Sequence, residues 1–121
     1  MTKIEELKEK AKVGWASFIS FEALTSTAAP KLVQFSGARQ GMKLLDVACG
    51  TGVVALTASR LGVEVEGIDL TPELISRAIE NSKIMGLKAK FVEGDAEFLP
   101  YKENEFDVVL SQYGHMFAPR P

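Results

Sequence analysis

Leu44-Leu45-Asp46-Val47-Ala48-Cys49-Gly50-Thr51-Gly52 is the stretch that decides the fold expected for this chain of 121 residues. Its apolar residues end on a carboxylate, turn through glycines and lead into Val53-Val54-Ala55-Leu56. This order predicts a buried strand, a tight turn and a helix. Glycines let the N–H groups of the turn approach a ligand closely, and the N-terminus of the helix adds a partial positive charge.

Asp46 decides which ligand suits this turn. The spacing Gly50-x-Gly52-x-x-Ala55 alone fits a dinucleotide fingerprint, which tolerates alanine at its third position. A pyrophosphate would face the Asp46 carboxylate with no basic residue nearby, at a cost of about 4 kcal/mol for an effective dielectric of about 20. An amino-acid-like ligand reverses the sign, because Asp46 holds its ammonium while the turn amides and the helix N-terminus hold its carboxylate. The sequence therefore favours S-adenosylmethionine over NAD.

Composition bounds the remaining possibilities. The chain has one domain's length, and 46% of it is hydrophobic, enough for one core. Fourteen Lys and Arg against 16 Asp and Glu give no basic field for nucleic acid. One cysteine excludes an internal disulfide, and no His/Cys cluster has metal-ligand spacing. With a charged N-terminus and no apolar run of about 18 residues, we expect a cytoplasmic protein without membrane contacts.

Residues 1–40 are predicted to form an N-terminal helical extension. Apolar side chains recur there at helical spacing, at Ile4, Leu7, Ala11, Trp15 and Phe18. Two interpretations stay open: the extension simply packs on the domain, or it is a lid whose aromatic side chains, with Phe21, close over a ligand. Thr25-Ser26-Thr27 offers N-caps for a second short helix, which Gly37 ends.

Residues 41–121 alternate regularly between strand and helix patterns. Strands are predicted at residues 43–47, 63–69, 89–93 and 106–110, and helices at 52–60 and from Thr71 to Gly86. Thr71 offers a capping hydroxyl and Pro72 suits a first helical turn. The alternation predicts an α/β fold with a doubly wound parallel sheet.

Each of the first three predicted strands ends on or near an acid, at Asp46, Asp69 and Asp95. Ligands of open parallel sheets bind outside the carboxyl ends of the strands. Asp69 follows the glycine turn at about the interval at which a carboxylate meets ribose hydroxyls. Asp95 can accept from an adenine amino group, with Ala96 stacked on the ring. The alternatives are a solvated acid capping the next helix for Asp69 and an ordinary turn residue for Asp95.

Four motifs resemble those of class I S-adenosylmethionine-dependent methyltransferases, in particular the small-molecule branch with the ubiquinone- and menaquinone-type enzymes. They are Leu45–Gly52, Gly67–Thr71, Gly94–Pro100 and Phe106–Ser111. The resemblance implies a Rossmann-like core and S-adenosyl-L-methionine as cofactor. It also implies a cofactor site made of Asp46, Ala48, Cys49, Gly50 and Gly52 at the methionine end, Asp69 at the ribose, Leu70, Asp95 and Ala96 at the adenine, and Ser111. Ala48 stands where the family usually has its first glycine.

The family pattern continues with a helix and further strands after the fourth strand, whereas this sequence stops at Pro121. We expect the fourth strand at or near a sheet edge, and a fragment, a truncated product or a homodimer that completes the sheet. The predicted function is methyl transfer to a small-molecule acceptor. One alternative is a non-catalytic cofactor-binding or assembly fragment. The other is an NAD-binding dehydrogenase domain, against which Asp46 argues.

The segment after the fourth strand should face the transferred methyl group. His115 is a candidate general base there because its ordinary pKa lies near neutrality, with a structural role as the alternative; Tyr113 is a second candidate. Cys49 has no histidine near it in the sequence, so we expect a buried thiol rather than a nucleophile.

Overall fold

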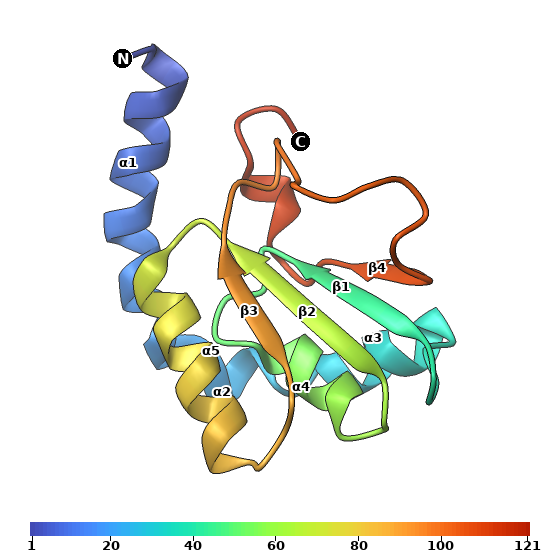
Figure 1. Cartoon of the computed structure of the whole chain (residues 1–121). Coiled ribbons are helices and arrows are strands. Elements are labelled where there is room, and N and C mark those ends of the chain that lie inside the picture. The colour runs from blue at the N-terminus through green and yellow to red at the C-terminus, as the bar shows by residue number, and fades with distance from the viewer.

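The parallel sheet predicted from the sequence is present in the computed structural model, which describes all residues from 1 to 121. Its strands are β1 (Lys43–Val47), β2 (Glu64–Asp69), β3 (Lys90–Glu93) and β4 (Val108–Leu110). All neighbouring pairs are parallel, and the spatial order is β3-β2-β1-β4 (Figure 1). Asp46 is level with Gly67 on one side and with Leu110 on the other. The carboxyl ends of the strands therefore meet at one end of the sheet.

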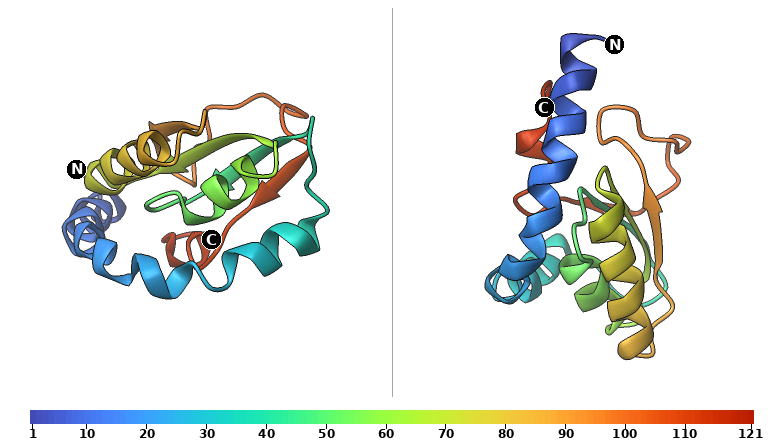
Figure 2. Two further views of the ribbon diagram at one scale, coloured as in Figure 1. Left: turned by 90° about the horizontal axis from the view of Figure 1, so that it is seen from below. Right: turned by 90° about the vertical axis from the view of Figure 1, so that its left-hand side faces the viewer.

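Helices cover one face of this sheet. They are α3 (Ala29–Ser36), α4 (Val53–Ser59) and α5 (Pro72–Ile84), and Figure 2 shows them on the side opposite the β3–β4 connection. Ala55 and Ala58 of α4 are fully buried and share one core with Val33 of α3, Val65 of β2 and Ala78 of α5. Because burying a valine-sized side chain is worth about 1.5–3 kcal/mol, this core fixes the helices against the sheet.

The other face is covered by the connection between β3 and β4, which contains no helix. Leu45, Val47 and Ile68 are buried on this face beneath Tyr101 and Phe106. The two aromatic rings meet edge to face with their centroids 5.0 Å apart. The chain thus crosses from β3 to β4 on the opposite side from α4 and α5, as expected for a doubly wound sheet.

Two predicted helix caps are wrong. Thr71 precedes α5, but its side chain makes no capping bond; its amide instead donates to Asp69 Oδ1 at 2.9 Å. Before α3, the hydroxyls of Thr25 and Thr27 donate backward, to the carbonyls of Glu22 and Leu24. The chain there is already in helical turns, so carbonyls three residues back lie closer than the amides ahead. Gly37 does end α3, with φ at 74°.

The chain begins with α1 (Lys3–Ala16), a 3-10 turn η1 (Ser17–Phe21) and α2 (Glu22–Thr25). α1 buries none of its residues and extends past the carboxyl ends of the strands, beside the C-terminal segment (Figures 1 and 2). Glu22 anchors this region to α5, accepting from Arg77 Nε at 3.3 Å and Asn81 Nδ2 at 3.2 Å. None of the helices combines the length and the apolar character that a membrane crossing requires.

Candidate active site

Asp46 lies at the tip of β1 and is only 1% exposed. Its Oδ2 accepts a hydrogen bond from the Ala55 amide in the first turn of α4, at 3.0 Å. Burial raises the pKa of this carboxyl to about 7, the Ala55 amide opposes the shift, and the nearby Asp69 adds to it. A ligand cation beside Asp46 would favour its charged form, which makes this position suited to an ammonium.

The turn after β1 takes a left-handed path at three residues, with φ at 55° for Ala48, 55° for Gly50 and 85° for Gly52. Gly52 has a second constraint, because a Cβ there would lie 2.8 Å from the ring of Phe91. The Ala48 methyl group is accommodated because it faces Gly114, where an added Cβ would come within 2.5 Å of it. The glycine that the family usually has at position 48 is therefore replaced at the cost of backbone strain.

Asp69, at the tip of β2, is held by two backbone amides. Gly50 donates to its Oδ2 at 2.8 Å and Thr71 donates to its Oδ1 at 2.9 Å. The side chain is largely buried, and this burial raises its pKa despite the two amides. Asp69 is therefore not the solvated helix cap of the alternative interpretation. Of the turn amides expected to hold a ligand carboxylate, that of Gly50 is engaged by Asp69 within the protein.

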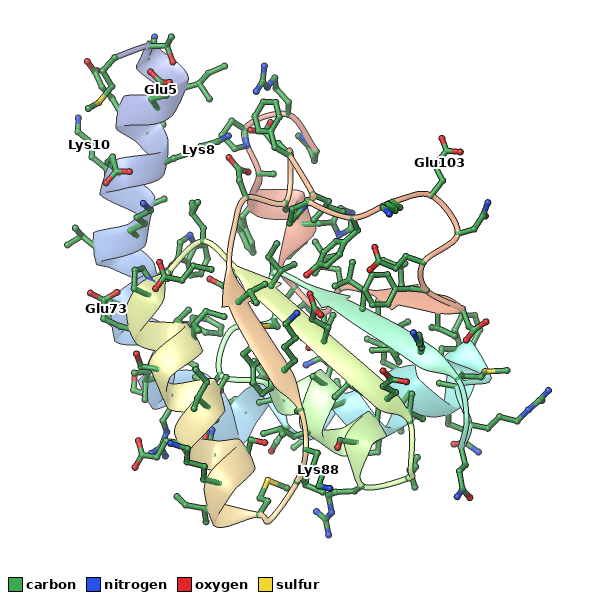
Figure 3. The ribbon with its side chains drawn as sticks, viewed as in Figure 1. Glu5, Lys8, Lys10, Glu73, Lys88 and Glu103 are labelled. Carbon is green, nitrogen blue, oxygen red and sulfur yellow. The ribbon has the colours of Figure 1, made fainter.

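Asp95 belongs to a charged cluster of four side chains, namely Lys8, Asp95, Glu97 and Arg120. Lys8 Nζ lies 2.5 Å from Asp95 Oδ2 and also pairs with Glu97. Arg120 pairs with Glu97 at 2.9 Å, and Arg120 and Lys8 lower the pKa of Glu97 to about 2. Figure 3 shows Lys8 reaching from α1 toward the loop that follows β3. The cluster joins the N-terminal helix, this loop and the C-terminal segment across the strand ends.

A cavity of about 400 Å³ lies between these elements. Eight of the ten predicted cofactor residues line it, namely Asp46, Ala48, Cys49, Gly50, Asp69, Leu70, Asp95 and Ala96. The other two, Gly52 and Ser111, do not line it. Gly52 packs against Phe91, and the Ser111 hydroxyl accepts from the His115 amide at 3.0 Å. These two positions shape the turns beside the cavity.

Aromatic side chains form another wall of the cavity. Trp15 packs 5.1 Å from Phe117 and 5.4 Å from Phe18, measured between ring centroids, and all three line the cavity. Phe21 packs on Phe18, also at 5.4 Å, but lies behind it, outside the lining. The N-terminal helices therefore close the side of the cavity opposite the strand tips.

The two candidate catalytic residues both lie at the cavity. His115 and Tyr113 are exposed and line it, and neither side chain makes a hydrogen bond within the protein. Tyr113 has a left-handed backbone with φ at 55°. Cys49 is buried, and burial raises the pKa of its thiol well above the usual range, so it is not poised as a nucleophile.

Sequence reasoning missed six polar residues that line the cavity: Lys8, Glu22, Thr25, Thr51, Thr71 and Gln112. Lys8 and Glu22 come from helical segments whose polar positions look like an ordinary solvated face. Gln112 could have been found from the sequence. It lies just after the fourth predicted strand, at the position corresponding to the acids at the ends of the first three strands.

The cavity residues fit S-adenosylmethionine, which carries an ammonium, two ribose hydroxyls and an adenine amino group. Carboxylates stand at the tips of β1 and β2 and just beyond β3, in the same row. The volume falls in the range of small-molecule sites, roughly 300–1,000 Å³. No cation lines the cavity except Lys8, which is paired with Asp95 and Glu97.

Comparisons with known proteins agree with this chemistry. A family model described as a methyltransferase domain matches residues 44–121. An uncharacterized protein of Mycobacterium tuberculosis is 46% identical over 99 residues, covering 82% of this chain and 36% of that protein. Demethylmenaquinone methyltransferase of Staphylococcus aureus is 38% identical over 92 residues, covering 74% of this chain and 38% of the enzyme.

Among solved structures, a SAM-dependent methyltransferase from Aquifex aeolicus superposes with a TM-score of 0.60 at 26% identity, covering 67% of this chain and 45% of that one. This chain thus spans less than half the length of each of these proteins. The match of the family model to more than half of the chain, together with these relatives, establishes the cofactor as S-adenosylmethionine. The chain belongs to the methyltransferase domain family, in its class I S-adenosylmethionine-dependent branch.

Proposed function

We propose that this protein transfers a methyl group from S-adenosylmethionine to a small-molecule acceptor. One observation carries the proposal: a single cavity has carboxylates at its strand-tip side and aromatic rings at the side of the N-terminal helices. The first surface suits a ligand rich in donors and positive charge, and the second suits an apolar acceptor. Placing both in one cavity brings two ligands together, which is what group transfer requires.

The cofactor residues receive the following roles in this proposal. Asp46 holds the ammonium, Asp69 the ribose hydroxyls and Asp95 the adenine amino group, while Leu70 and Ala96 flank the adenine. The two backbone amides on Asp69 fix its carboxylate before the ligand arrives. Bound S-adenosylmethionine supplies a methyl group on a sulfonium, a good leaving group, so the protein mainly has to bind, orient and exclude water.

The acceptor is a small molecule with an apolar, ring-shaped body in this proposal. Two features support it: the wall of Trp15, Phe18 and Phe117, and the similarity to an enzyme named for demethylmenaquinone. A general base is needed only for an acceptor that must lose a proton, and we infer that His115, which lines the cavity, takes that proton. Tyr113 is the second candidate.

We also infer that residues 1–40 include the lid expected from the sequence, over a core formed by residues 41–121. The support is the position of Trp15 and Phe18 in the cavity wall and of Lys8 in the charged cluster. Because α1 buries no residue, its closed position depends mainly on these side-chain contacts.

Calorimetric titration of S-adenosylmethionine, S-adenosylhomocysteine and NADH into the chain tests the cofactor assignment. The two adenosyl ligands should bind and NADH should not, and Asp69→Ala should weaken binding. Asp107→Ala is a matched control, since Asp107 accepts from the Lys43 amide at the far end of β1, away from the cavity. A folded chain that binds neither adenosyl ligand would contradict the proposal.

An assembly role is the second candidate, favoured by the free edge of β4. Val109 on this edge strand is 57% exposed, and such an edge can pair with another chain. A homodimer through β4 predicts a doubled native mass that Val109→Lys abolishes. A native mass that stays monomeric at a chain concentration of about 1 mM, where even a weak interface with a Kd of about 1 mM would be substantially paired, would count against it.

A further inference from the structure

Gln112 has one half of its side-chain amide engaged and the other half free. Its Nε2 donates to the Thr25 carbonyl at 2.8 Å, linking the segment after β4 to the end of α2. Its Oε1 is buried and has no hydrogen-bond partner. The bond to Thr25 also fixes which way the amide points, because the reverse orientation would set two carbonyl oxygens against each other. The unused atom is therefore an acceptor.

The place of Gln112 in the sheet order indicates which ligand uses this acceptor. The order β3-β2-β1-β4 puts the polar groups of the strand tips in a row, with Asp95 near β3, Asp69 on β2, Asp46 on β1 and Gln112 just beyond β4. The proposed function assigns the three acids to the three donor groups of the cofactor. Neighbouring strands lie about 4.8 Å apart. Gln112 therefore lies one strand spacing beyond Asp46, past the end of the site that holds the methionine part of the cofactor.

The surroundings of Gln112 are those of the proposed acceptor side. It lines the same cavity as Trp15, Phe18 and Phe117, and Thr25 follows closely on the segment that carries Phe18. An unpartnered buried carbonyl beside these aromatic rings selects for a ligand that brings a donor, because leaving it unpaired costs a hydrogen bond.

We propose that Gln112 is a specificity residue that accepts a hydrogen bond from the methyl acceptor, so that the acceptor is an apolar ring bearing a hydroxyl or N–H group. This inference rests on the proposed function for the identity of the two halves of the cavity. Gln112 recognises and orients the acceptor; it takes no part in the bonds that form and break.

The test compares p-cresol with 4-methylanisole, its methyl ether, which keeps the ring and the oxygen but lacks the O–H donor and carries one extra methyl group. Both are titrated into the 121-residue chain, with and without S-adenosylhomocysteine, and followed through backbone and side-chain amide resonances. Wild type should bind p-cresol about fivefold more tightly, the ratio for one net hydrogen bond to a neutral acceptor. The Gln112 side-chain NH₂ resonances should shift with p-cresol and not with the ether.

Two variants separate recognition from a purely structural role. Gln112→Met removes both halves of the amide, and the preference should fall to a ratio near one. Gln112→Glu removes the donor to Thr25 but keeps acceptor oxygens, so the preference for p-cresol should persist even if the chain is less stable. If Gln112→Met does not fold, the wild-type ratio and the NH₂ shift decide.

A wild-type ratio near one, or an unchanged preference in Gln112→Met, would overturn the inference and leave Oε1 as a buried acceptor with no role in binding. The cofactor assignment fails separately, by the absence of S-adenosylhomocysteine binding. Even then, the ratio of p-cresol to 4-methylanisole affinity, measured without S-adenosylhomocysteine, decides the role of Gln112.

Discussion

Replacing Asp46 with asparagine should stabilise the ligand-free protein at high pH while weakening cofactor binding. The carboxyl is 1% exposed, and burial raises its pKa from 3.8 to about 7. Only its Oδ2 accepts a hydrogen bond within the protein, from the Ala55 amide. An asparagine keeps that bond through its carbonyl oxygen and removes the charge that burial penalises.

The magnitude follows from the two pKa values. Between about pH 4 and pH 7 the folded protein holds a proton on Asp46 that the unfolded chain has released, so the free energy of unfolding falls as pH rises. At about 1.4 kcal/mol for each pKa unit, the loss is at most about 4 kcal/mol above pH 7. Asp46→Asn should therefore be nearly as stable as wild type at about pH 4 and about 2–4 kcal/mol more stable at about pH 8.

Urea unfolding at several pH values, followed by tryptophan fluorescence, measures this difference. Trp15 is the only tryptophan and packs against Phe18 and Phe117, so its emission reports on the cavity wall. Asp69→Asn is the matched control, because both oxygens of Asp69 accept hydrogen bonds from backbone amides. The NH₂ group of an asparagine there would face one of these N–H donors, so the variant should not be more stable than wild type at any pH.

The result that would refute the reasoning is an Asp46→Asn variant that is no more stable than wild type at about pH 8, or a difference that does not change with pH. Calorimetry supplies the second half of the prediction. Loss of a charged hydrogen bond to the cofactor ammonium should weaken S-adenosylmethionine binding by roughly 10- to 100-fold.

Three further changes test the turn and the charged cluster. Ala48→Gly should raise the free energy of unfolding by about 0.5–1 kcal/mol by relieving the left-handed backbone, whereas Ala55→Gly in α4 should lower it; urea unfolding gives both values. Gly114→Ala should destabilise by about 1–3 kcal/mol because its methyl would meet that of Ala48, and combining it with Ala48→Gly should recover part of the loss in the same assay. Lys8→Gln should speed amide hydrogen exchange in α1, while Lys12→Gln, which breaks only a pair within the helix, should not.

Much of the core could be predicted from the sequence because its signals are local. Apolar runs of strand length, glycines at the first turn and proline at the start of α5 each act within a few residues, and the strands and helices lie close to the predicted ranges. Chain order then placed Asp46 and Asp69 together, because parallel strands align their carboxyl ends. The acids of the cavity were therefore within reach of sequence reasoning.

The contacts between segments far apart in the chain were decided only by the tertiary structure. Lys8 meets Asp95, and Gln112 meets Thr25, each across 87 residues, and no local pattern specifies such pairs. The failed caps at Thr71 and Thr25 have a related cause, since each hydroxyl's surroundings depend on the path of the whole turn. The pKa of Asp46 likewise depends on burial. The sequence by itself determined which residues stand at the strand ends, and packing determined their partners, their charge and the walls of the cavity between them.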